Sequence, residues 1–290
     1  MLFASTASAQ TFDRPQRVDT TLTLEKNGTV SVSIYSGHVN VVGTSGSQVR
    51  IRGTTEQDEL DIRDRAGSIS LSLEPDRGHG GRAELELSVP IGTSVILESF
   101  SGPLSVRGVK GEVRLEALSG DLSINDAVGS VSAEAVSGSI DIGKVDGNVR
   151  AESVSGSVSV ADAEGDITTE TVSGRISILR AKTRSASAET VSGSIGYTGT
   201  IDPMGNYTFK THSGRLTLGI PTNASASVSL ETFSGTVDSD FPVTLETSKQ
   251  QNGHESRFNF RIGDGRARIT LETFSGNIVI QRGTNIDNRE

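Results

Sequence analysis

The residues best suited to chemistry in this 290-residue chain are glutamates at a fixed spacing. Each stands four residues before the glycine of a recurring string, Glu-x-apolar-Ser-Gly, and Lys210 takes this place once. If the strings stack as neighbouring parallel strands, the carboxylates lie about 4.8 Å apart and repel one another. The set comprises Glu98, Glu116, Glu134, Glu152, Glu170, Glu189, Glu231 and Glu272.

Four mechanisms would reduce this repulsion between the carboxylates. They are a line of divalent cations, basic groups of a ligand, raised carboxylate pKa values, and the arginines Arg114 and Arg150 two residues upstream. The alternative is that the side chains splay into water and discourage aggregation. The candidate ligand-facing residues are Glu116, Glu134, Glu152, Glu170 and Glu189. The chain offers no catalytic residue, no cofactor site and no assigned metal site.

Serine and histidine give weaker signals. A serine precedes each corner glycine, and its hydroxyl either forms a ladder for a polysaccharide or satisfies a backbone group at the bend. The second interpretation is favoured because no acid or histidine accompanies these serines at fixed spacing. The four histidines, His38, His79, His212 and His254, are scattered, and His212 replaces an apolar residue that we predict to point inward.

The elements that position these residues follow from the glycines. From Gly102 to Gly174 they recur every nine residues, and alternate ones close the string, which gives an 18-residue repeat of two halves. Residues two and four positions after these glycines are apolar, with Thr169 as the one exception, and indicate strands. The apolar residue seven positions after, Val154 for example, is predicted inward as well. About six inward side chains leave no room for an internal ligand cavity. The fold class is therefore an all-β parallel β-solenoid, expected to be right-handed.

The chain divides into four predicted parts. Residues 1–9 resemble the end of a secretory leader, with cleavage expected before Gln10, so the protein is expected to be exported, periplasmic or extracellular. Residues 10–92 form irregular β coils or a cap, 93–240 the regular solenoid, and 241–290 an insertion loop followed by a C-terminal coil. Glycine-rich loops are expected at 74–82 and 248–256, and a third loop around Pro203-Met204-Gly205.

Composition excludes several classes of partner. The net charge is -9, with 27 basic residues scattered among 36 acidic ones, so neither nucleic acid nor an anionic membrane is expected to bind. No apolar run is long enough to embed the chain in a membrane. The absence of Cys excludes disulfides, thiol catalysis and Cys-ligated zinc. The nine-residue spacing lacks the glycine doublets and regular aspartates of calcium-binding β-rolls.

Several motifs resemble those of a known family. Val89-Pro90-Ile91-Gly92 precedes the run of Ser-Gly corners, and Ile262-Gly263-Asp264-Gly265 leads into the final ITLETFSGNIVI. From about Val30 to Ile280 the chain is similar to the bacterial "putative adhesin" family, DUF4097, which is close to DUF2807. The resemblance implies an exported β-solenoid at the cell envelope with a role in adhesion or envelope stress. It supplies no active-site motif.

The favoured function is a non-enzymatic cell-envelope scaffold or adhesin-like module. It would bind an extended envelope polysaccharide or a protein partner through the solenoid faces. The main alternative is a carbohydrate-active β-helix enzyme of the polysaccharide lyase or hydrolase type. The chain has no Trp and only three Tyr, which disfavours this alternative because sugar-processing clefts commonly stack sugar rings on these side chains. An ice- or crystal-surface binder is disfavoured because charged residues interrupt the outward Ser/Thr ladder at Asp121, Asp141, Arg175 and Arg215.

Overall fold

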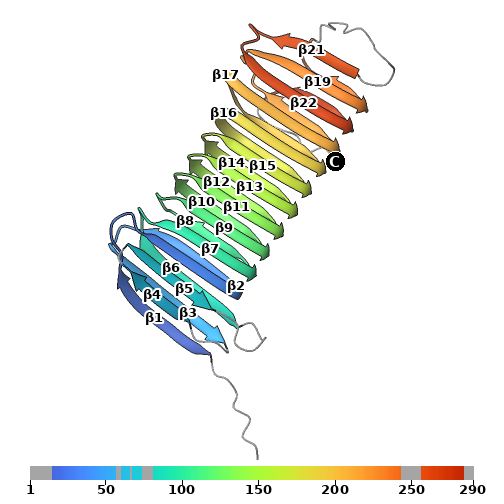
Figure 1. Ribbon diagram of the computed structural model, residues 1–290. Helices are drawn as coiled ribbons and strands as arrows, with labels where there is room; N and C mark the ends of the chain where they lie inside the picture. Colours follow the sequence, from blue (N-terminus) through green and yellow to red (C-terminus); the bar gives the residue numbers. More distant parts are fainter. Residues whose placement is uncertain (1–14, 57–59, 66, 74–80, 243–255, 284–290) are drawn as a thin grey trace, which may run out of the picture.

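The protein is a long stack of β-strands, shown by a computed structural model that describes residues 15–56, 60–65, 67–73, 81–242 and 256–283 (Figure 1). Every regular element in this part is a strand, and the part contains no helix able to cross a membrane. The predicted leader, His79, His254 and most of both glycine-rich loops lie outside the described residues. The loop predicted around Pro203-Met204-Gly205 is wrong, because these residues lie within the strand Ile195–Ser213.

The regular coils each contain two strands, all but one of them of seven residues or fewer. Those of the central part are β7(Ser94–Ser101), β8(Leu104–Arg107), β9(Val113–Ser119), β10(Leu122–Val128), β11(Val131–Ser137), β12(Ile140–Asp146), β13(Val149–Ser155), β14(Val158–Glu164) and β15(Ile167–Ser173), of which only β7 is longer. Two long strands then each run through a whole turn: β16(Ile176–Ser192) and β17(Ile195–Ser213).

The strands at the two ends are less uniform. The N-terminal ones are β1(Gln16–Thr23), β2(Thr29–Thr44), β3(Gln48–Glu56), β4(Asp61–Arg65), β5(Ser68–Leu73) and β6(Arg82–Pro90). The C-terminal ones are β18(Leu216–Ile220), β19(Ala226–Ser234), β20(Val237–Ser239), β21(Ser256–Ile262), β22(Ala267–Ser275) and β23(Ile278–Arg282).

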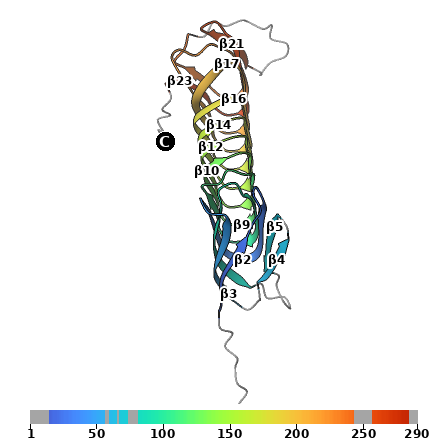
Figure 2. The same cartoon turned by 90° about the vertical axis from the view of Figure 1, so that its left-hand side faces the viewer.

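Equivalent strands of successive coils pair in parallel and in register. Glu134 of β11 lies between Glu116 of β9 and Glu152 of β13, with no offset along the strand. Strands β10, β12 and β14 pair in the same way on the other side of the coil. The result is the expected parallel β-solenoid, and Figure 2 shows how thin it is when seen edge-on.

Close approach of backbones explains the glycine at each Ser-Gly corner. Gly138 has a φ of 136°, and a Cβ placed on it would lie 2.2 Å from the carbonyl oxygen of Gly120 in the neighbouring coil. Its amide donates to the carbonyl of Ser155 in the next coil at 3.2 Å. The other strand of the coil bends at a left-handed non-glycine residue, such as Lys144 with a φ of 53°. Glycine is therefore required where coils touch.

One part of the predicted inward register is wrong. In the Ser-Gly halves the inward position is the residue before the predicted one, so Ser153 is buried and Val154 is 49% exposed. Strand alternation simply continues from Val149 through Ala151 to Ser153, and the bend follows it. The inner corner is cramped, because a Cβ on Gly156 would lie 3.1 Å from the Ser153 hydroxyl. In the other halves the prediction is confirmed for Val109, Ala127, Val145, Ala163 and Ala181.

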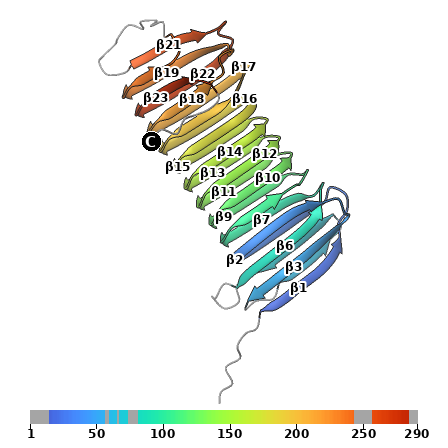
Figure 3. The same cartoon turned by 180° about the vertical axis from the view of Figure 1, so that it is seen from behind.

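Both ends of the solenoid contain a coil inserted out of chain order. At the N-terminal end β2 lies between the coil of β5 and β6 and the coil of β7 and β8. Figure 3 shows β7, β2, β6, β3 and β1 following one another, with the last two pairings antiparallel.

The C-terminal end has the same design. The last strands in sequence, β22 and β23, insert between the coil of β17 and β18 and the coil of β19 and β20. Antiparallel β21 then covers β19. The first and last complete turns of the chain are thus held from both sides, and antiparallel strands cover the outermost coils.

Candidate ligand groove

The predicted glutamates form one continuous column on the outer surface, here called the glutamate column. Backbone register fixes its order, and Glu272 precedes Glu231 because β22 is inserted before β19. The order along the stack is Glu98, Glu116, Glu134, Glu152, Glu170, Glu189, Lys210, Glu272 and Glu231.

Basic neighbours relieve the repulsion in part of the column. Arg114 pairs with Glu116 and lies 3.9 Å from Glu134, while Arg150 pairs with Glu152. The hydrogen bond and charge of Glu116 raise the pKa of Arg114 above its usual range. Further along, Lys210 contacts Glu272 at 2.8 Å.

Three other carboxylates of the central column differ from these. Among the described residues, Glu98, Glu170 and Glu189 have no ion-pair partner within 4.0 Å. Nor do three or more His, Asp or Glu side chains gather in this part of the chain as they would around a metal ion.

A second column, which the sequence reading placed inside, runs beside the first. It consists of the apolar residue of each string, and its members are strongly exposed, at 42% for Leu118 and 50% for Val172. We call it the apolar column. Its order is Tyr35, Phe100, Leu118, Val136, Val154, Val172, Val191, His212, Phe274 and Phe233.

Flat rings stack at both ends of the apolar column. Tyr35 and Phe100 have ring centroids 4.8 Å apart and planes 6° apart. His212 stacks on Phe274 and Phe274 on Phe233, each at 4.8 Å and within 4° of parallel. His212 is therefore an outward member of the apolar column, and its predicted inward position is wrong. Because the rings cover one another, they present edges rather than faces to a ligand lying along the column.

The two columns are the walls of a groove of about 830 Å³. It is lined from Tyr35 to Val191 by the glutamates, the apolar residues and the small residues between them, such as Ala135 and Ser153. A further hollow of about 340 Å³ continues past Lys210 and His212 to Phe233. The described side chains that line the main groove include no Asp, His, Lys or Arg. The sequence contains a signal for this groove, because Glu134 and Val136 are two residues apart on a strand and must share a face.

Another outward column of the same molecule shows that like charges are not a general property of its coils. At the left-handed bends the residues are Asp126, Lys144, Asp162 and Arg180, with alternating sign. Arg180 binds both carboxylate oxygens of Asp162, at 2.7 and 2.6 Å, and lowers the pKa of that group. The charges at these bends thus alternate in sign, whereas the glutamate column repeats one sign.

The corner serines have a different role from the predicted one. They are exposed, and their carbonyl oxygens, rather than their hydroxyls, accept the corner hydrogen bonds, as when the Gly120 amide donates to Ser137 at 2.9 Å. Among the described residues the hydroxyls of Ser119, Ser137, Ser155 and Ser173 form no hydrogen bond within the chain. They form a row of free donors beside the apolar column.

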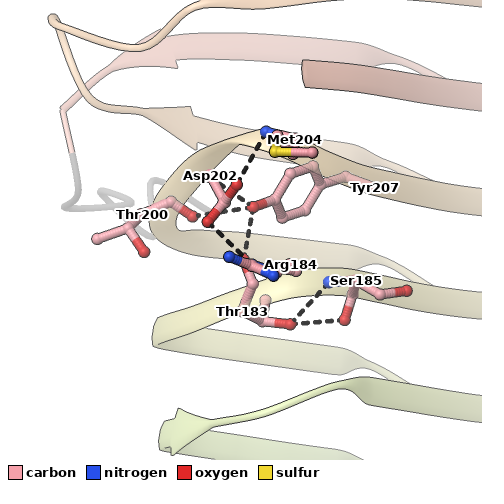
Figure 4. A network of polar contacts seen from close by, with 7 residues as sticks. All are labelled: Thr183, Arg184, Ser185, Thr200, Asp202, Met204 and Tyr207. Carbon is pink, nitrogen blue, oxygen red and sulfur yellow. Dashed lines mark hydrogen bonds and ion pairs between the residues drawn. The ribbon is translucent and has the colours of Figure 1, made fainter. Parts of the chain in front are cut away.

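A polar network at the widest coil is structural in character. The Tyr207 hydroxyl donates to the Thr183 carbonyl at 2.6 Å and accepts from the Asp202 amide at 2.9 Å, while Arg184 lies 3.4 Å from Asp202 (Figure 4). Burial raises the pKa of Tyr207, so the hydroxyl stays protonated as a donor. The network fills a longer turn and leaves its groups paired, which gives no reactive arrangement.

Comparison with known proteins supports the fold family. Residues 162–281 match the profile of the family described as Toastrack DUF4097, which confirms the resemblance over that stretch. No curated protein matches the sequence.

Solved structures with some similarity carry adhesin descriptions. One is a "putative cell adhesion protein" from Clostridium sporogenes, 11% identical, covering 92% of this chain and 100% of that one with a TM-score of 0.28. Another is a "putative adhesin" from Bacteroides fragilis, 8% identical, covering 91% and 97% with a TM-score of 0.43. A third, a "putative adhesin" from Parabacteroides distasonis, is 8% identical and covers 92% and 97% with a TM-score of 0.28.

Proposed function

The chain carries a Toastrack domain of the DUF4097 family over residues 162–281, and on that premise we propose that it is a non-enzymatic, adhesin-like docking module of the cell envelope. The groove is its binding site, with Glu116, Glu134, Glu152, Glu170 and Glu189 on one wall. The protein is exported, which the Ala7-Ser8-Ala9 pattern supports. It works without a cofactor.

The observation that carries this proposal is the pairing of two uninterrupted columns along one groove. A site that performs a reaction needs unlike groups converging on one point, such as a nucleophile, a base and an acid. Here one wall repeats glutamate from coil to coil, and the wall facing it repeats an apolar residue from Phe100 to Val191. Repeated weak contacts suit an extended partner, whose avidity grows with the number of coils engaged.

The ring geometry also bears on the enzyme alternative. Sugar-binding clefts stack a sugar ring on an exposed aromatic face, and in the groove the faces of Tyr35 and Phe100 lie against each other. Glycoside hydrolysis needs two carboxyl groups in different environments, one as the acid and one as the nucleophile or base, whereas the column repeats one residue type from coil to coil. These features favour docking over turnover.

The test compares two variants that add the same charge. Val136→Glu/Val154→Glu places carboxylates on the apolar wall, whereas Ser123→Glu/Ser130→Glu places them at exposed positions outside the groove. Purified protein would be sedimented with isolated peptidoglycan and with total envelope fragments. We expect the control to bind as the original chain does and the groove variant to lose at least tenfold in affinity.

Two outcomes would overturn the proposal. Equal binding by both variants would show that the groove is not the site. Release of unsaturated or reducing sugar ends from an envelope polysaccharide, abolished by replacing a single Asp, Arg or Lys, would establish the enzyme instead.

A further inference from the structure

We propose that the partner that fits the groove is a second copy of this chain, lying alongside in the same direction, so that the apolar column of each copy enters the groove of the other. This inference rests on the proposed function, since it takes the groove to be a docking surface, and it names the occupant. The contact would be homophilic, between equal surfaces related by a two-fold axis parallel to the stack.

Spacing is the first argument. Both columns repeat once per coil, at the parallel-strand separation of about 4.8 Å, over the whole run from Tyr35 to Phe233. An extended polypeptide repeats on one face about every 6.6 Å and loses register within three coils. An α-helix advances about 5.4 Å per turn and drifts by a full step over about eight coils. Another copy of this solenoid keeps register over every coil.

The order of features across the face is the second argument. At one coil it runs Glu152, the small buried Ser153, exposed Val154 and exposed Ser155. A two-fold axis parallel to the stack reverses this order in the partner. When Val154 of one copy lies over the small-residue floor of the other, the reverse contact forms at the same time, and both apolar columns leave water.

The rims of this contact are chemically complementary. Beyond each inserted valine, Ser155 of one copy faces Glu152 of the other, and the same holds for every coil. Among the described residues, the serine hydroxyls have no acceptor, and the carboxylates of Glu98, Glu170 and Glu189 have no ion-pair partner. Hydroxyl donation to a carboxylate is a strong hydrogen bond. The glutamate columns lie at opposite rims and never face each other.

The apolar column itself needs such a cover. Single exposed apolar residues are ordinary, but Phe100, Leu118, Val136, Val154, Val172 and Val191 are consecutive neighbours, each at least 42% exposed. A continuous apolar strip on a protein surface marks an interaction site. A self-complementary strip with acceptors at one edge and donors at the other favours a second copy over a basic peptide, which would leave the serines unused.

Cross-linking tests the geometry directly, because the chain has no Cys of its own. Two single variants are made, Glu152→Cys and Ser155→Cys. Under mild oxidation we expect neither alone to form a covalent dimer, because equivalent residues lie at opposite rims. An equimolar mixture should form the disulfide-linked mixed dimer at least tenfold faster than either variant alone forms a dimer with itself. A mixture of Ser123→Cys and Ser130→Cys, outside the groove, is the control.

Sedimentation equilibrium supplies the second measurement. The original chain and Ser123→Glu/Ser130→Glu should dimerise, with the Kd of Val136→Glu/Val154→Glu raised at least 100-fold while its melting curve stays cooperative. A chain that remains monomeric at about 1 mM, or cross-linking of each variant with itself in preference to the mixture, overturns the inference. If the chain does not dimerise but its binding to envelope fragments still depends on the groove, the proposed function stands and only the second copy as partner is excluded. If envelope binding does not depend on the groove either, the proposed function and the inferred dimer are both wrong.

Discussion

At the scale of single residues, the effect of a mutation depends on whether the side chain points into the core or outward. Val154 and Val158 are neighbours of the same type, yet Val154 is 49% exposed and Val158 is fully buried. Val158→Asp should unfold several coils, because an unpaired charge in so thin a core costs several kcal/mol. Val154→Asp should melt within a few degrees of the original chain. Thermal melts followed by far-UV circular dichroism compare the two, and equal losses would refute the described register.

The Asp162–Arg180 pair makes a prediction about pH. Arg180 lowers the folded pKa of Asp162, so the stability that the pair contributes is present above the ordinary aspartate pKa of about 4 and is lost as the pH falls through the lowered value. Asp162→Asn should melt lower than the original chain at pH 7 and equally at pH 2, by a small margin because the pair is exposed. Asp141→Asn is the control, and a gap that persists in acid would contradict this account.

At the scale of elements, the Ser-Gly corner sets how closely coils can stack. A Cβ on Gly138 meets a backbone carbonyl oxygen at 2.2 Å, and its φ of 136° is unfavourable for any other residue. Gly138→Ala should therefore cost well over the roughly 1 kcal/mol typical of a tolerated change. At Gly143 the nearest atom is the end of the Asn125 side chain, so Gly143→Ala should be nearly neutral. Urea melts of both variants measure the difference.

The inserted coils make a second prediction at this scale. Deleting residues 138–155 removes one 18-residue unit and joins β11 to β14 in register. That variant should fold with one cooperative transition. Removing residues 267–290 leaves a gap between β17 and β19 and should unfold the C-terminal end, although the segment is the last in the chain. Hydrogen exchange resolves the two cases, and protection of β19 after the truncation would count against the inserted arrangement.

At the scale of the whole molecule, the solenoid acts as a ruler that repeats one short surface motif along its length. Each coil contributes one carboxylate, one apolar side chain and one hydroxyl to the groove face. Self-association should therefore weaken in steps as coils are lost. The variant lacking residues 138–155 should have a several-fold higher Kd than the full chain, measured by sedimentation equilibrium, with no single residue essential. An unchanged Kd would mean that the contact does not run along the central coils.

The sequence by itself determined the solenoid, its repeat and the column of glutamates. These depend on local spacing: alternation defines strands, and Gly120 and Gly138 recur exactly one coil apart, so that identical positions must stack. The inward positions of the other halves, such as Val145, followed for the same reason.

Only the tertiary structure decided on which side of the bend Val154 lies and where β2, β22 and β23 pair. Hydrophobicity placed Val154 inside, but backbone alternation and the cramped inner corner give that place to Ser153. The insertion of the end coils depends on pairing between segments remote in sequence, such as β7 with β2 and β17 with β22. Local periodicity is the same for a strand at the end of the stack and for one inserted within it, so the groove and its ends arise only when the whole chain has folded.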